Sequence, residues 1–168
     1  MGLDMYLMKR KRFHQPTCAD IKFEPGKGNI FVKNPESVMI RGADDIEVSY
    51  EAIYWRKANM VHKWFVDNIQ GGEDDCGEYD VPIEKLEELM ETCNKVLENH
   101  ELASELLPTK NGSFFGDTEY DEYYFDGVKY TAEKIKEVLD DFKSEVEALE
   151  ETGYNIPVTI SFYYTSWW

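Results

Sequence analysis

Four side chains in one short stretch of the sequence have the chemistry to bind a small ligand. Trp55 offers a flat aromatic face, and Arg56 carries a permanent positive charge. Asn59 and His62 add groups that donate or accept hydrogen bonds. An aromatic face beside a guanidinium group recognises planar and anionic molecules. The residue types and their spacing therefore predict a concave site for a small planar anion.

Further basic and aromatic residues complete this candidate site. Lys63 follows in the same stretch, and residues 109–127 are rich in both aromatic and acidic side chains. Three tyrosines of that segment are expected to stack on a nucleobase: Tyr120, Tyr123 and Tyr124. With the basic side chains neutralising a phosphate, the leading ligand class is a small, cyclic or modified nucleotide.

The ligand-binding stretch is expected to lie on one helix, over residues 51–68. At 100° per residue its apolar side chains cover a wide arc, which consists of Ile53, Tyr54, Ala58, Met60, Val61, Trp64 and Phe65. His62 falls inside this arc and Asn59 on its border. Two interpretations stay open. The helix belongs to the core and these two side chains find partners there, or they line a cavity.

The remaining elements can be read from apolar periodicity and from turn residues. The expected strands lie at residues 1–9, in short pieces within 21–50, and at 158–165; further helices lie at 81–107, broken near 99–100, and at 131–151. This pattern predicts an α+β fold with a mainly antiparallel twisted sheet, which includes both terminal strands and packs against about three helices. A helical layer with a separate β-hairpin arm is the alternative.

Length and composition favour one domain over residues 1–168. The chain is 42% apolar, and it contains no apolar run long enough to span a membrane and no signal-peptide pattern. We therefore expect a cytoplasmic protein with no membrane partner. The three cysteines are odd in number and far apart, so neither a disulfide framework nor a zinc site is expected.

The net charge of −16 limits the class of partner. Residues 1–63 hold eleven Lys and Arg against eight Asp and Glu, whereas residues 64–168 hold seven against twenty-six. Such acidity repels extended nucleic acid, although a small anion in a local basic pocket is still expected to bind. The basic run at residues 9–12 is either a solvated strand end or an anion site. The acidity is also typical of a protein that imitates a polyanion and thereby binds another protein.

Neither of the two acidic loops, at residues 74–80 and 117–122, matches the spacing of a known calcium motif. Solvated acidic loops are the common case, and we expect neither a metal nor another cofactor. No pattern typical of a nucleophilic enzyme, a zinc protease or a phosphate-binding loop occurs, and no catalytic residue is predicted.

Several blocks of sequence resemble a family of small proteins that bacteriophages and prophages encode. The blocks are the opening MGLDMYL, then YWRKAN and HKWF, the loop EDDC, the segment FFGDTEYDEYY and a terminal strand that ends in a Ser–Trp pair. The resemblance implies an origin in phage or in the bacterial cytoplasm. It implies no active-site residues. The β-rich residues 14–48 depart from the shorter members of that family.

These observations lead to one functional hypothesis and two alternatives. The first is a non-enzymatic accessory protein of phage type, which binds a small anionic ligand and sequesters a nucleotide signal of host defence. The alternatives are an acidic inhibitor that binds a host protein, and a metal-dependent phosphodiesterase or hydrolase that uses the acidic loops. The two terminal tryptophans are expected to dock on a surface or across a contact between subunits of a homo-oligomer.

Overall fold

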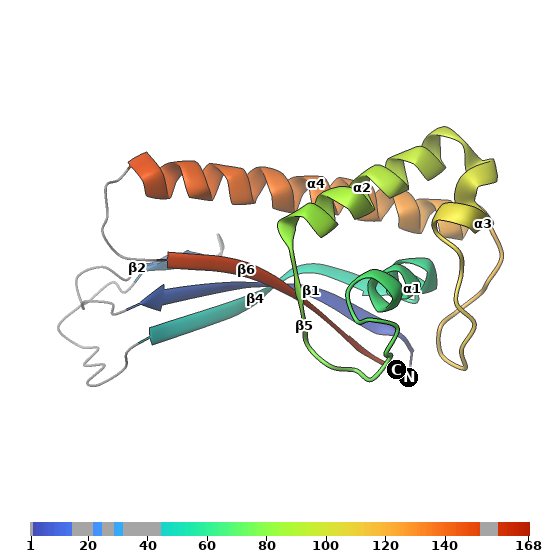
Figure 1. The fold of residues 1–168 in the computed structure, drawn as a ribbon, viewed down its shortest axis with the longest axis horizontal. Helices are drawn as coiled ribbons and strands as arrows, with labels where there is room; N and C mark the ends of the chain where they lie inside the picture. Colours follow the sequence, from blue (N-terminus) through green and yellow to red (C-terminus); the bar gives the residue numbers. More distant parts are fainter. Residues whose placement is uncertain (1, 15–21, 25–28, 32–44, 152–157) are drawn as a thin grey trace.

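One antiparallel four-stranded sheet, covered by helices on one face, organises the molecule (Figure 1). The computed structural model describes residues 2–14, 22–24, 29–31, 45–151 and 158–168. The sheet has the order β4–β1–β6–β5, in which β1 spans Asp4–His14, β4 Asp45–Arg56, β5 Tyr79–Val81 and β6 Val158–Trp167. Two short strands, β2 (Lys22–Glu24) and β3 (Asn29–Phe31), pair separately. The expected α+β class is confirmed, and both terminal strands lie in the sheet.

The helices differ in their place on the sheet. They are α1 (Asn59–Asn68), α2 (Ile83–Glu98), α3 (Ala103–Leu106) and α4 (Glu122–Glu151), with a 3-10 turn over His100–Leu102. The long α4 runs along one face of the sheet with α2 beside it, whereas α1 and α3 lie toward the end that holds both chain termini (Figure 1). The apolar stripe predicted for α2 is buried, and the helix ends at the expected break near Asn99.

Side chains of β1 alternate between the core and the opposite face of the sheet. Met5 and Leu7 are fully buried beneath the helices, while Asp4 and Tyr6 lie on the other face. Because β1 pairs with β4 on one side and β6 on the other, each neighbour follows the same alternation. The register of β1 therefore decides which side chains of β4 reach the core.

The helix expected over residues 51–68 is wrong in its first half. Residues 51–56 complete β4, and α1 begins only at Asn59. Ile53 and Trp55 point into the core, Tyr54 and Arg56 lie on the opposite face, and pairing with β1 satisfies the backbone. This alternation with a period of two is that of a strand, and β-branched and aromatic residues favour strands over helices. The chain turns at Lys57, whose φ is 56°.

Helix α4 begins at Glu122, well before the start at Thr131 that the apolar pattern indicates. Its first turn is capped by Asp121, whose Oδ1 accepts a hydrogen bond of 3.0 Å from the backbone N–H of Tyr124. The aromatic and acidic segment 109–127 therefore divides into a loop and the first turns of α4.

The basic run at residues 9–12 lies within β1, so its side chains alternate like the rest of the strand. Lys9 and Lys11 are buried, and each forms an ion pair of 2.9 Å with Glu145 of α4. Arg12 pairs with Glu47 on the other face. The two lysines therefore do not belong to a solvated strand end. Their anionic partner is the carboxylate of Glu145.

Other expectations fall on residues that the structure leaves out. Of the strand pieces expected within 21–50, those that fall on residues 32–44 lie outside the described residues. In the part of the chain that is described, every helix is too short or too polar to cross a membrane.

Candidate functional site

A groove between the edge strand β4 and the first turns of α4 brings together part of the residue set expected from the sequence. Its volume is about 390 Å³, within the range of small-molecule sites. The lining comes from the end of β4, the turn after it, the start of α1 and one face of α4: Tyr54, Trp55, Arg56, Ala58, Met60, Tyr123, Asp126, Gly127 and Tyr130.

The α4 wall of the groove is built by helical periodicity. Tyr123, Asp126, Gly127 and Tyr130 fall within about 100° of arc on the helix, because 3.6 residues make one turn. A Cβ atom at position 127 would lie only 2.6 Å from Cε of Met60. Glycine therefore lets α4 approach α1 closely and leaves room between the two tyrosine rings.

The β4 wall is an outer sheet edge whose carbonyl groups meet the tyrosines. The N–H of Lys57 donates to the carbonyl oxygen of Leu3, just before β1, at 2.8 Å, so by alternation the backbone groups of Tyr54 and Arg56 face away from β1. Tyr123 Oη donates to the carbonyl oxygen of Arg56 at 3.3 Å, and Tyr130 Oη donates to that of Tyr54 at 3.1 Å. These rings remain 60% and 40% exposed, so the bonds fix them while leaving surface for a ligand.

Two neighbouring cations lie beside the groove. Arg56 and Lys57 are both exposed, and neither forms an ion pair with a carboxylate of the described residues. The buried Gly2 makes room beneath them, because a Cβ there would lie 3.3 Å from Cε of Lys57 and 3.7 Å from Nη2 of Arg56. In a protein of net charge −16, this pair is a local positive site.

Trp55 lines the groove only in part, because its ring belongs to the core. It is 3% exposed, and its Nε1–H donates to Thr131 Oγ1 at 3.0 Å. The ring of Phe65 lies 5.9 Å from it, centroid to centroid. The faces available for stacking in the groove are therefore those of the exposed tyrosines.

Asn59, another predicted site residue, holds a loop in place. Its Nδ2 donates to the carbonyl oxygens of Phe115 and Asp117 at 3.1 and 2.6 Å, and its Oδ1 accepts from the backbone N–H of Lys110 at 3.1 Å. Both N–H donors of the amide and one lone pair of its oxygen are therefore used. Asn59 is buried and lies outside the groove lining.

His62 is fully buried at the centre of a polar network outside the groove. Its Nδ1 lies 2.8 Å from Tyr164 Oη, and its Nε2 lies 3.1 Å from Oδ2 of Asp74. The Asp74 carboxylate accepts a hydrogen bond from Nε2–H, which leaves Nδ1 to accept one from the Tyr164 hydroxyl. Lys110 forms an ion pair with the same Asp74 oxygen. The arrangement joins α1, β6 and two loops.

Burial sets the protonation state of this network. Desolvation lowers the pKa of His62, and the hydrogen bond to Asp74 opposes that change only in part. Burial also raises the pKa of Tyr164 well above its usual value. The imidazole and the phenol are therefore neutral near pH 7, and the ionic pair is Asp74 with Lys110.

The other predicted site residues also lie outside the groove lining. Lys63 forms an ion pair of 2.7 Å with Asp67 on the surface of α1. Tyr120 accepts a hydrogen bond of 3.4 Å from the backbone of the preceding loop. Tyr124 is buried and donates to the carbonyl oxygen of Leu107 at 2.7 Å. Of the eight residues expected at one site, the groove contains Trp55, Arg56 and Tyr123.

Some groove residues were not identified from the sequence, namely Tyr54, Ala58, Met60, Asp126, Gly127 and Tyr130. The missing signal was the start of α4. With a cap at Asp121, the seven-residue spacing of Tyr123 and Tyr130 places both on one helix face, with Gly127 between them.

The acidic loops use their carboxylates in local turns. Asp75 accepts from the N–H of Gly77 at 2.9 Å and from the hydroxyl of Tyr79 at 3.0 Å. Asp117 accepts from the N–H of Glu119 at 2.9 Å. Within the described ranges, no three His, Cys, Asp or Glu side chains are grouped as metal ligands would be.

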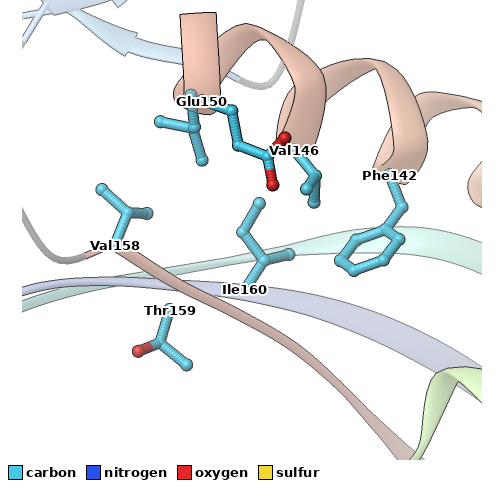
Figure 2. Close-up of a pocket in the computed structure, with 7 residues that line it drawn as sticks. Phe142, Val146, Glu150, Val158, Thr159 and Ile160 are labelled. Atoms are coloured by element: carbon cyan, nitrogen blue, oxygen red, sulfur yellow. The ribbon is translucent and has the colours of Figure 1, made fainter. Parts of the chain in front are cut away.

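A second cavity, of about 430 Å³, lies between the C-terminal turns of α4 and the start of β6. Figure 2 shows Phe142, Val146 and Glu150 facing Ile160 and Val158, with Thr159 on the far side of the strand. This lining is mainly apolar, and its one ionisable group is the carboxylate of Glu150. The β4–α4 groove is therefore the better candidate for binding an anion.

Searches with the sequence against protein-family models and curated proteins, and with the fold against solved structures, returned no match.

Proposed function

We propose that this protein binds a small planar anion in the β4–α4 groove. The observation that carries the proposal is the adjacent pair Arg56 and Lys57, which are exposed and have no carboxylate partner among the described residues. Arg56 lines the groove together with two exposed tyrosines. A nucleotide is the leading ligand class because it combines a stacking ring with a phosphate. In this proposal the protein is a non-enzymatic accessory protein of phage type that sequesters a nucleotide signal.

The two parts of such a ligand find different partners. An aromatic ring that stacks on Tyr123 or Tyr130 contributes roughly 1–3 kcal/mol, as bases do on aromatic platforms. The phosphate is placed beside Arg56, whose planar guanidinium group bonds two oxygens at once. The Lys57 ammonium adds a second, more flexible charge.

The charge distribution favours a small ligand over a long polyanion. Acidic residues dominate the part of the chain after residue 63, where a second and third phosphate of an extended strand would be repelled. A mononucleotide or small cyclic nucleotide concentrates its charge on one phosphate region, which the basic pair can neutralise.

Arg56→Ala should weaken nucleotide binding about ten- to a hundredfold, because a hydrogen bond to a charged group contributes about 1.5–3 kcal/mol. The fold should be unaffected, since Arg56 is exposed. Isothermal titration with linear and cyclic nucleotides, supported by mass spectrometry of molecules released from the purified protein, measures this. Recovery of the bound nucleotide unchanged after prolonged incubation distinguishes sequestration from turnover.

The matched control is Lys63→Ala. It removes one positive charge nearby, but Lys63 is paired with Asp67 and lies outside the groove lining, so affinity should change less than threefold. Absence of binding to every nucleotide at high micromolar concentration refutes the proposal. Equal losses in the two variants would show that net charge, not the groove, governs binding.

The runner-up function is inhibition of a host protein. The same end of the molecule exposes Phe114 (41%) and Trp167 (63%), and aromatic side chains of this kind anchor protein interfaces. Acidic residues of the neighbouring loop would suit a basic partner. A protein that ignores nucleotides but forms a defined complex with a basic host protein, lost in Trp167→Ala, would place this function first.

A further inference from the structure

The middle of the groove is rich in hydrogen-bond acceptors. Tyr123 and Tyr130 each commit their hydroxyl proton to a strand carbonyl group, so each oxygen presents only lone pairs to a ligand. Between them on the same face of α4 lies Asp126, whose carboxylate is exposed and forms no ion pair or hydrogen bond with any described residue that would compete with a ligand. A planar ligand must therefore bring N–H donors to this part of the groove.

The end of the groove beside β4 has the opposite character. The backbone N–H of Arg56 faces outward along the strand edge, between the two carbonyl groups that the tyrosines occupy. The guanidinium group of Arg56 lies against Gly2, at the end of β4. Lys57 adds an ammonium group. The groove thus has acceptors along its helix wall, whereas its strand end offers one outward backbone N–H and lies beside the two cations.

Common nucleobases differ in how well they match this pattern. Guanine places N1–H and the 2-amino group side by side, so one carboxylate accepts both hydrogen bonds without facing a lone pair. Adenine and cytosine place a ring-nitrogen acceptor beside the amino donor, which would face the carboxylate of Asp126 with the wrong polarity. Hypoxanthine has N1–H but lacks the second donor.

We infer that the groove is selective for guanine nucleotides, and that Asp126 is the residue that reads the base through its N1–H and 2-amino donors. This inference rests on the proposed function, because it names the ligand class for the same groove. Asp126 determines specificity here, whereas Arg56 and Lys57 hold the phosphate of any nucleotide.

The test compares GMP, IMP, AMP and XMP by isothermal titration. The parent protein should bind GMP at least tenfold more tightly than AMP, with IMP between them. Asp126→Asn should weaken GMP binding about ten- to a hundredfold. It should also strengthen XMP binding, because a carboxamide donates to the 2-oxo group of xanthine and still accepts from N1–H.

Glu133→Gln is the matched control, since it neutralises an exposed carboxylate on the same helix outside the groove. It should leave all four affinities unchanged, and unchanged melting temperatures would show that both variants are folded. If GMP and AMP bind equally, or if Asp126→Asn leaves their ratio unchanged, Asp126 does not read the base and only this inference fails. If none of the four nucleotides binds, this inference fails, and the proposed function fails with it only if the other linear and cyclic nucleotides also do not bind.

Discussion

Single side chains of this protein show how the same residue types serve either stability or binding. Asn59 and His62 have the hydrogen-bonding chemistry of a ligand site, but both are buried and use their polar atoms on the protein itself. Arg56 and Asp126 are exposed and have no such partners among the described residues. Burial and pairing, which depend on tertiary structure, separate the two groups.

His62 should make stability depend on pH in a defined window. Its pKa is lower in the folded protein than the unfolded value of about 6.5, so below that value the unfolded chain binds more protons. This contribution is fully present above about pH 7 and is lost as the pH falls through about 6.5 toward the folded pKa. Urea titrations between about pH 7.5 and 5.5, above the range of ordinary carboxylates, measure the slope.

His62→Gln should flatten that slope, although it will also lower stability through the lost network. The control is His100→Gln, because His100 is exposed and stacks on Phe125 at 3.7 Å without entering the network. A slope that persists in His62→Gln, or vanishes in His100→Gln, would assign the pH dependence to another group.

Elements with one clear apolar period were easier to identify from the sequence than the stretch at residues 51–58. The alternation in β6 and the apolar stripe of α2 each gave the correct structure, because a single period runs through them. Residues 51–58 carry apolar side chains at spacings that fit both periods, and pairing with β1 decided in favour of a strand. The sequence placed Arg56 at the candidate site but on the wrong element.

The groove was predicted only in part for the same reason. Its walls come from β4 and α4, which meet through contacts between residues that lie far apart in the chain. Local patterns identify an aromatic, basic stretch but do not reveal which tyrosines meet the strand edge. The sequence does not distinguish Asp126 from the many other acidic residues, because its lack of a partner among the described residues depends on the fold.

Helix α1 is expected to owe its position to one aromatic contact with the sheet. Phe65 is fully buried and stacks on Tyr164 of β6 with ring centroids 4.0 Å apart and planes 9° apart. Phe65→Ala should lower the free energy of unfolding by about 3–5 kcal/mol, as truncation of a buried aromatic does. Trp167→Ala, at a side chain 63% exposed, should change it by about 0.5 kcal/mol or less. Denaturant titration of both variants is the measurement; similar losses would contradict this role for Phe65.

At the scale of the whole molecule, the uneven charge should make salt act in opposite directions on folding and on binding. Repulsion among the acidic residues that outnumber basic ones after residue 63 weakens the compact state. Salt shortens the Debye length from about 30 Å at 0.01 M to about 3 Å at 1 M, so the melting temperature should rise across this range. Over the same range nucleotide affinity should fall, because the attraction of Arg56 and Lys57 for phosphate is screened.

Thermal unfolding and isothermal titration on one salt series test both trends, with sucrose at matched osmolality as the control for non-ionic effects. A melting temperature that falls with salt would mean that surface ion pairs such as Lys63–Asp67, which salt screens, outweigh the general repulsion.

The position of β1 between β4 and β6 also sets the order in which the sheet is completed during synthesis. The strand pairs Asp4 with Trp167, so its second ladder joins residues separated by almost the whole described chain. Until β6 leaves the ribosome, β1 can pair with β4 alone, and its other edge is unpaired. The apolar side chains that face α4 are then partly exposed to water. Contacts of such high sequence separation fold slowly and expose a strand edge meanwhile. Nascent chains that stall before β6 are thus the form of this protein with the greatest need for a chaperone.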